Sequence, residues 1–181
     1  KRPLHVGRPN LPDKDLLHKY LDSIFDNRWL TNNGPLVREF REKLEQYLAV
    51  KYCIPLCNGT IALELAERAL GFNNEVVLPS YTFVATAHSL QWQRIKPVFA
   101  DIGEGSVTVD PNSIKGAITP NTSGIIGVHV YAHPCDYKSI DALASENHLK
   151  VIYDAAHAFG CEVNDIPYAS LGDASVFSFH A

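Results

Sequence analysis

The stretch VIYDAAHAFG, residues 151–160, decides our interpretation of the fold. It opens with an apolar run that ends in an acid, Asp154, and continues with alanines, a histidine (His157) and a glycine. A short apolar run followed by small residues is typical of a buried strand and the turn after it. A carboxylate at the end of such a strand is costly unless hydrogen-bond donors or a cation meet it. The stretch therefore predicts either an acid that caps a turn or an acid that contacts a ligand.

Strands and helices alternate on both sides of this stretch. Apolar runs predict strands over residues 52–57, 75–79, 96–101, 123–131, 149–154, 161–163 and 174–179. Helical periodicity and end signals predict helices over residues 58–71, 82–92, 110–118 and 135–148. In the third helix we expect Asp110 as the N-cap and Pro111 at the first position. Because the strands are apolar throughout, the pattern predicts an α/β fold with a mostly parallel sheet sandwiched by helices.

Two amphipathic helices precede this alternation. Residues 13–27 and 36–48 each place apolar side chains on one helical face, and a turn-rich segment separates them. We therefore expect an N-terminal helical arm over residues 1–50 and part of a large domain over residues 51–181. The chain has no methionine and closes on VFSFHA, which reads as a strand that has barely finished. We expect the C-terminal remainder of a longer protein to be absent from this chain.

Composition narrows the class of protein. The chain has 181 residues, a formal charge of −4, 46% apolar residues and 20% charged residues, as expected of a soluble globular protein. It has no basic patch, no apolar stretch long enough to cross a membrane and no signal peptide, so we expect neither nucleic acid nor membrane as a partner. None of the four cysteines forms a C-x-x-C pair. We expect reduced core thiols, no metal site and a cytoplasmic protein.

Ligands of parallel sheets collect at the carboxyl ends of the strands, and several predicted strand ends carry suitable residues. Gly59 and Thr60 open a helix, where free N–H groups favour a phosphate, although an ordinary capped helix has the same appearance. Phe83 follows another strand and would either stack on a flat ring or pack in the core. Ser178 is a candidate phosphate donor. Neither glycine-rich nucleotide fingerprint is present, which disfavours a plain nucleotide-binding module.

Asp154 suits a protonated pyridine nitrogen. Such a pair favours the protonated ring, which is the electron sink of pyridoxal 5′-phosphate (PLP). The alanines after Asp154 leave room for a flat ring beside the backbone, and His157 can reach a ring substituent or a phosphate. The alternative is a turn-capping acid followed by a surface histidine.

Six motifs in order resemble one family, the PLP-dependent sugar-nucleotide aminotransferases of the DegT/DnrJ/EryC1/StrS group, which have fold type I. The motifs are NGT-x-AL-x-L, LPSYTFVATAHSL, KPVFADI, GVHVY, VIYDAAHAFG and GDASVFSFHA. The resemblance implies that PLP is the cofactor and that Asp154 and His157 are catalytic. It also implies that the cofactor is bound by Gly59, Thr60, Phe83, Asp154, His157 and Ser178. The Schiff-base lysine of the family is expected two residues beyond Ala181.

The segment WLTNNGP, residues 29–35, is most similar to enzymes that aminate a nucleotide-linked 4-keto-6-deoxyhexose. This similarity implies substrate contacts at Asn32, Asn33 and Gly34, which otherwise form a turn between two helices. Ala132 and His133 depart from the family's usual loop, which leaves specificity at that loop open.

The resemblance implies a homodimer that passes the amino group of L-glutamate to dTDP-4-keto-6-deoxyglucose with ping-pong kinetics. In the family, each active site borrows residues from the partner. Three alternatives stay open: a 3-keto-sugar aminotransferase, a PLP-dependent sugar 3-dehydratase in which histidine replaces the lysine, and a non-enzymatic PLP-binding regulator.

Overall fold

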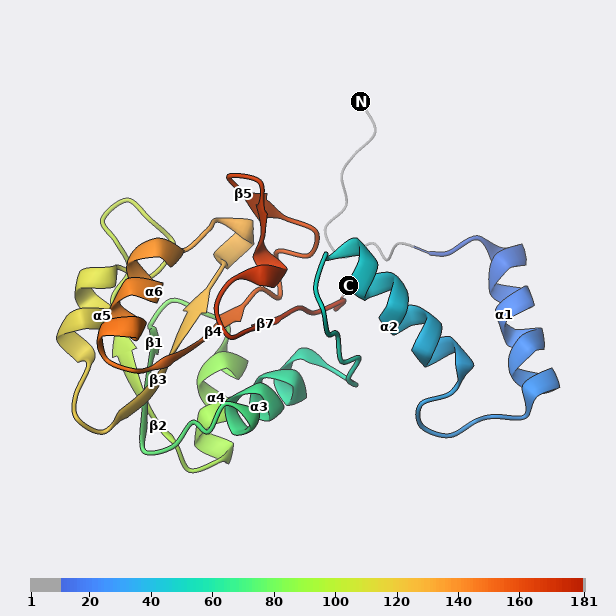
Figure 1. Cartoon of the computed structure of the whole chain (residues 1–181), viewed down its shortest axis with the longest axis horizontal. Coiled ribbons are helices and arrows are strands. Elements are labelled where there is room, and N and C mark those ends of the chain that lie inside the picture. The colour runs from blue at the N-terminus through green and yellow to red at the C-terminus, as the bar shows by residue number, and fades with distance from the viewer. Residues whose placement is uncertain (1–10, 181) are drawn as a thin grey trace.

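A five-stranded parallel sheet organises the chain (Figure 1). The computed structural model describes residues 11–180. The strands lie in the order β2-β1-β3-β4-β7, and every neighbouring pair is parallel. Their bounds are β1 Glu75–Pro79, β2 Lys96–Ala100, β3 Thr122–Val128, β4 Lys150–Asp154 and β7 Ala174–Val176. The predicted α/β class is confirmed.

Helices cover both faces of the sheet. One layer contains α3 (Gly59–Ala69) and α4 (Val84–Trp92), and the other contains α5 (Pro111–Ala117) and α6 (Tyr137–Glu146). Successive strand residues point to opposite faces, so Val76 and Leu78 of β1 join the core under α3 and α4. Val77 between them joins the core under α5 and α6. Burial on both faces explains why the strands are apolar throughout.

Side-chain caps fix four of the helix starts, one of them that of α6, where Asp136 accepts from the Ser139 N–H. Asp13 accepts from the Leu16 N–H at the start of α1 (Lys14–Asn27), and Asn58 accepts from the Ile61 N–H at the start of α3. Asp110 caps α5, whose first residue is Pro111, as the sequence predicted.

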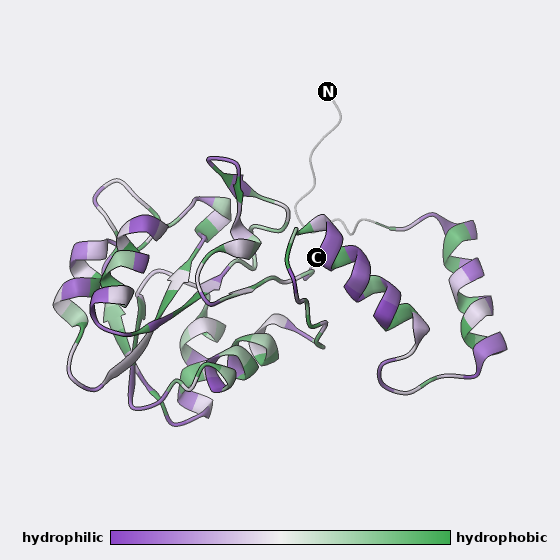
Figure 2. Ribbon diagram, in the orientation of Figure 1, coloured by the Kyte–Doolittle hydropathy of each residue, from purple (hydrophilic) through white to green (hydrophobic). Residues whose placement is uncertain are grey.

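The two N-terminal helices stand to one side of the sheet and its helices (Figure 1). α1 buries none of its residues, and α2 (Pro35–Tyr47) buries Leu44. The end of α2 reaches the rest of the fold, because the Tyr47 ring stacks on Phe159 with centroids 5.4 Å apart. Figure 2 shows apolar residues distributed along both helices, outside the core of the sheet. Residues 1–10 of the predicted arm lie outside the described residues.

Several predicted strands are wrong or too long. Residues 52–57 form no strand. The Cys53 N–H donates to Glu45 Oε1 at 3.1 Å, and Pro55 has no N–H for pairing with a neighbouring strand. β3 ends at Val128 and leads into a 3-10 turn, η1 (Val130–Ala132), while β7 ends at Val176. The run at 161–163 gives β5 (Glu162–Val163), which pairs antiparallel with β6 (Ile166–Pro167) in a separate sheet. A second 3-10 turn, η2 (Tyr168–Ser170), follows.

The cysteines do not all lie in or near the core. Cys135 is buried and Cys53 and Cys161 are half-buried, but Cys57 is exposed, contrary to the prediction. No helix within residues 11–180 is both long enough and apolar enough to cross a membrane. Over the same range, no three His, Cys, Asp or Glu side chains are grouped closely enough to hold a metal ion.

Candidate active site

The candidate site lies along the carboxyl ends of the strands. Val128 of β3, Asp154 of β4 and Val176 of β7 pair at one level of the sheet. The strand order changes direction at β1, because β2 is added on one side of β1 and β3, β4 and β7 follow on the other. Parallel α/β sheets bind ligands outside the carboxyl ends of the strands, at such a switch point.

Asp154 is the last residue of β4 and is only 6% exposed. Its Oδ2 accepts a 2.8 Å hydrogen bond from the Thr86 hydroxyl, and its Oδ1 accepts a 3.2 Å hydrogen bond from the Ala156 N–H. Burial raises the pKa of Asp154, and these two donors and the charge of His157 oppose the rise. Within residues 11–180 it forms no ion pair with lysine or arginine. Asp154 therefore caps the turn and still has lone pairs for a cationic ligand.

His157 is exposed and is held by a backbone contact. Its Nδ1 accepts a 3.2 Å hydrogen bond from the Tyr131 N–H, so the neutral ring carries its proton on Nε2. The His157 and Tyr131 rings stack with centroids 5.4 Å apart and an interplanar angle of 11°. Tyr131 has a φ of 49°, a left-handed conformation that is uncommon for a non-glycine residue and is found at functional sites. This contact leaves Nε2–H free to donate to a ligand.

Gly59 and Ser178 come together from opposite ends of the described chain. A Cβ placed on Gly59 would lie 3.3 Å from the Ser178 Cβ and 3.5 Å from its Oγ. Within residues 11–180, the N–H groups of Gly59 and Thr60 donate no hydrogen bond to a group outside α3. Two free N–H groups at a helix start beside a serine hydroxyl form a suitable phosphate-binding turn.

Phe83 lies in the loop between β1 and α4, where it is the N-cap residue of α4. Its side chain is 71% exposed, so the alternative that it packs in the core is wrong. An exposed aromatic ring next to the carboxyl end of β1 remains available for stacking.

Sequence reasoning missed the residues that surround Asp154. Thr86 of α4 contacts it directly, and on the same helix Ser89 and Gln93 both donate to the buried Glu67 of α3. Burial raises the pKa of Glu67 to about 7. The signal in the sequence is the spacing of Thr86 and Ser89, which places two polar side chains on one face of the helix, with Gln93 at its C-cap.

The tyrosines at this edge were missed as well. The Tyr131 contacts described above come from η1, and the nearby Tyr131 side chain raises the pKa of Tyr81. Both side chains are exposed, which is compatible with contact to a ligand.

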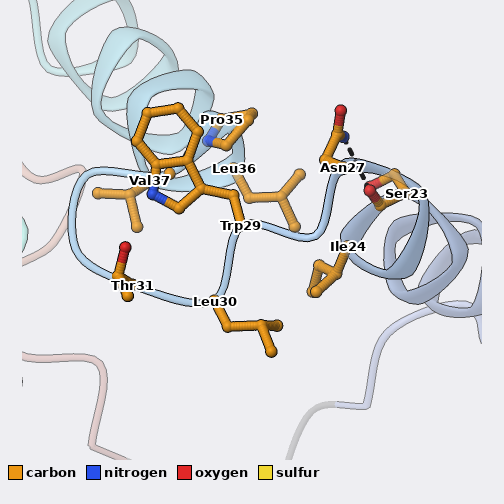
Figure 3. A pocket seen from close by; sticks show the side chains of 10 residues that line it. Ser23, Ile24, Asn27, Trp29, Leu30, Thr31, Pro35, Leu36 and Val37 are labelled. Carbon is orange, nitrogen blue, oxygen red and sulfur yellow. Dashed lines mark hydrogen bonds between the residues drawn. The ribbon is translucent and has the colours of Figure 1, made fainter.

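Asn32, Asn33 and Gly34 do not join this group within one chain. They form the turn between α1 and α2, which Figure 1 places away from the carboxyl end of β4. Gly34 lines a hollow of about 240 Å³ between the two helices, beside Trp29 and Leu36 (Figure 3). The Arg38 guanidinium lies over the Trp29 ring, 5.1 Å from its centroid.

The residues at the sheet edge fit PLP. Asp154 is a buried carboxylate that has donors on both oxygens but no cationic partner, which suits a protonated pyridine nitrogen. Ser178 lies beside Gly59. A side chain at position 59 would fill the space next to the Ser178 hydroxyl, where a phosphate would bind. The turn at Gly59 and Ser178 suits the phosphate of the cofactor, and Asp154 suits its protonated ring nitrogen. Both lie at one edge of the sheet.

Comparison with known families gives one match that covers most of the chain. A model described as the DegT/DnrJ/EryC1/StrS aminotransferase family matches residues 13–181. The chain is 48% identical to the dTDP-4-amino-4,6-dideoxy-D-glucose transaminase of Shigella dysenteriae, over 100% of this chain and 49% of that protein. It is 45% identical to the Escherichia coli protein of the same name, over 88% of this chain and 43% of that protein. The chain thus spans about half the length of the curated relatives it matches.

Solved structures agree with the fold. The crystal structure of DesI in the presence of its TDP-sugar product superposes with a TM-score of 0.94 and 46% identity, over 99% of this chain and 46% of that chain. The structure of NtdA from Bacillus subtilis with bound cofactor PMP gives a TM-score of 0.75 and 31% identity, over 83% of this chain and 35% of that chain.

Proposed function

Because the chain belongs to the DegT/DnrJ/EryC1/StrS aminotransferase family, we propose that it works as a PLP-dependent aminotransferase, with L-glutamate as donor and a nucleotide-linked keto sugar as acceptor. The observation that carries the proposal is the buried Asp154 carboxylate, which has hydrogen-bond donors but no cation. The cofactor contributes a protonated pyridine ring, which draws electrons from the substrate carbon that carries the nitrogen.

Two side chains contact the cofactor ring through hydrogen bonds in this proposal. Asp154 accepts the ring N–H and, by its negative charge, keeps the ring protonated. The Nε2–H of His157, which the Tyr131 N–H orients through Nδ1, donates to a ring oxygen or to the phosphate side. The lysine that would carry the cofactor is expected beyond Ala181.

The other residues bind and cover the cofactor. The N–H groups of Gly59 and Thr60 and the hydroxyl of Ser178 bind the phosphate, because they meet at the start of α3. The exposed ring of Phe83 would cover one face of the pyridine and exclude water from it.

The proposed acceptor is dTDP-4-keto-6-deoxyglucose, which would become the 4-amino-4,6-dideoxy sugar. Support comes from the two relatives at 48% and 45% identity, both named as dTDP-4-amino-4,6-dideoxy-D-glucose transaminases. The experiment is to offer the 4-keto sugar and its 3-keto isomer on the same nucleotide and to identify the amino sugar by mass spectrometry and NMR. Amination of the 3-keto isomer alone would instead support the 3-keto-sugar alternative.

The proposed assembly is a homodimer, which would cover the apolar surface of the arm. α1 has no buried residue, and Leu16, Leu17, Leu21 and Phe25 remain exposed on it. An amphipathic helix with an uncovered apolar face requires a partner. We assign a second copy of this chain to that face, and the turn at Asn32, Asn33 and Gly34 to the partner's active site. Light scattering after size-exclusion chromatography measures the mass, and a monomer would contradict the assignment.

A mixed-dimer experiment tests the shared site. One chain carries Asp154→Asn, and the other carries Asn32→Ala with Asn33→Ala. Each homodimer should be inactive, whereas the mixed dimer should regain activity, because one of its two sites combines an intact Asp154 with an intact turn. No recovery would mean that the turn acts on its own chain, and an active Asn32→Ala, Asn33→Ala homodimer would mean that the turn takes no part in the site.

The proposed compartment is the cytoplasm. All four cysteines are unpaired, as expected where thiols are kept reduced. Cell fractionation with an antibody to the protein tests this placement.

A visible absorption spectrum of the purified full-length protein with PLP tests the proposed aminotransferase function. Binding should give a band that glutamate converts to that of pyridoxamine phosphate. A bound cofactor that glutamate leaves unchanged would favour the dehydratase alternative, and no binding would remove PLP from the proposal.

A further inference from the structure

Glu67 is a buried acid that the proposed reaction does not use. It lies on α3 with 0% of its surface exposed. Its Oε1 accepts from the Ser89 hydroxyl and its Oε2 accepts from the Gln93 side-chain amide, both at 2.6 Å. A buried carboxyl usually destabilises a fold relative to an apolar side chain, so its position invites a functional explanation.

A line of polar groups on α4 connects Glu67 to Asp154. The Ser89 hydroxyl lies 3.0 Å from the Thr86 carbonyl oxygen, and the Thr86 hydroxyl lies 2.8 Å from Asp154 Oδ2. Thr86 and Ser89 lie on one face of α4, and Gln93 is the C-cap residue of that helix; their side chains contact α3 and the end of β4. The two carboxyl groups therefore contact one short segment of α4, Glu67 through the Ser89 hydroxyl and Asp154 through the Thr86 hydroxyl.

The Ser89 hydroxyl has one proton and two acceptors within reach. When Glu67 is ionised, Ser89 donates to its Oε1, the shorter contact. When Glu67 is protonated on Oε1, that group donates to Ser89, and Ser89 then donates to the Thr86 carbonyl. The proton on Glu67 thus decides whether the Ser89 hydroxyl donates to Glu67 or to the backbone carbonyl of Thr86, the residue that contacts Asp154.

We propose that Glu67 is a positioning residue for Asp154: through Ser89 and Thr86, and through its own charge, it sets how strongly Asp154 holds a proton. The purpose of this coupling rests on the proposed function, in which Asp154 keeps the cofactor ring protonated. The coupling itself belongs to the chain without cofactor and can be measured there.

The charges around Glu67 support mutual coupling. Burial is the main cause that raises the pKa of Glu67, the two hydrogen bonds lower it, and the charges of Glu64 and Asp154 raise it further. From the elements packed on α3, β4 contributes Asp154, while its Lys150 pairs with Asp173 and its Tyr153 packs in the core on the other face of the sheet. β7 contributes no titratable group, and His88 of α4 is exposed. Within residues 11–180 no cation pairs with Glu67. Because Coulomb interactions are mutual, each carboxylate disfavours ionisation of the other.

Carboxyl-carbon NMR of the cofactor-free full chain, with labelled Asp and Glu, tests the coupling. The Glu67 signal should titrate near pH 7. The Asp154 signal should show a second inflection at the same pH. Asp154→Asn should move the Glu67 midpoint to lower pH, and Glu67→Gln should remove the second inflection. Both substitutions keep the side-chain shape, and either one alone suffices as a test if the other variant does not fold.

Glu64→Gln is the matched control, one turn earlier on α3. It should lower the Glu67 midpoint, because the Glu64 charge raises it. The second inflection of Asp154 should move with that midpoint and remain. An unchanged Glu67 midpoint in Asp154→Asn, together with an Asp154 curve that ignores Glu67→Gln, would overturn the proposal.

With PLP bound, the pH at which the cofactor spectrum changes should fall in Glu67→Gln, because a carboxylate behind Asp154 favours ring protonation. The two proposals fail differently. Absence of PLP binding in the unmodified protein would reject the proposed function but leave the NMR coupling intact. PLP binding without the coupling would reject only the role of Glu67.

Discussion

The hydroxyl of Thr86 donates a 2.8 Å hydrogen bond to Oδ2 of Asp154, which lies 68 residues further along the chain. Both residues are buried. The Thr82 hydroxyl lies 2.8 Å from that of Thr86 and can donate to it once the Thr86 proton is committed to Asp154. This bond ties the end of β4 to the helix that begins beside Phe83.

Replacing Thr86 by valine should destabilise the protein by about 1–3 kcal/mol, since the buried Oδ2 of Asp154 loses its donor while the side-chain shape is kept. The same change should raise the pKa of Asp154 further, because the Thr86 hydrogen bond lowers it. Urea unfolding measures the first effect and carboxyl NMR the second. Thr86→Ser, which keeps the hydroxyl, is the control. A valine variant equal to the unmodified protein in both measurements would show that the bond contributes nothing.

The stability of the protein should depend on pH through Glu67. Its pKa is about 7 in the folded chain against 4.5 for an unperturbed glutamate, so the folded state binds more protons between these values. The free energy of unfolding should therefore fall as the pH rises from about 4.5 to about 7, by about 3 kcal/mol in total, and should then stay level. Denaturant unfolding at a series of pH values measures this. Glu67→Gln should remove that part of the dependence, and parallel curves for the two proteins would contradict it.

Replacing Phe83 by alanine should weaken PLP binding more than it weakens the fold. The ring is 71% exposed, so its removal should change the unfolding free energy by about 0.5 kcal/mol or less. Loss of a stacked ring should cost about 1 kcal/mol of affinity, or roughly fivefold in Kd. Phe99, on the edge strand β2 and 55% exposed, provides the control, because Phe99→Ala should leave PLP affinity unchanged. A large loss of stability with intact PLP affinity in Phe83→Ala would point to a structural role.

Replacing Gly59 by alanine should act on the phosphate of the cofactor. The new Cβ would lie 3.3 Å from the Ser178 Cβ and push the two segments apart. We expect PLP affinity to fall about tenfold, whereas pyridoxal, which lacks the phosphate, should bind nearly as before. Gly116 has open space around it, so Gly116→Ala is the control. Equal losses for PLP and pyridoxal would place the phosphate elsewhere.

The positions of Asp154, Gly59 and Ser178 at one edge were predictable from the sequence. Each follows or ends an apolar run, and the carboxyl ends of parallel strands meet at the same side of a sheet. The run at residues 52–57 shows the limit of this reasoning. It leads to Gly59 as expected, but it forms no strand. The prediction failed because a short apolar run does not show whether a neighbouring strand is available to pair with it.

The partners of Asp154 were not predictable in this way. Thr86 and Glu67 lie on helices whose rotation about their axes is set by packing on the sheet, and small polar residues in a helix usually face solvent. The exposure of Phe83 was also undecided, because one aromatic ring at a helix start suits a core or a surface equally well.

By itself, the sequence determined the alternation of strands and helices and the loops that carry the candidate site, because these depend on periodicity and capping within short segments. Only the tertiary structure decided which groups meet: Gly59 with Ser178, Tyr131 with His157, Ser89 with Glu67 and Thr86 with Asp154. Those contacts join segments far apart in the chain. They depend on strand order and helix rotation, which the packing of the whole core sets.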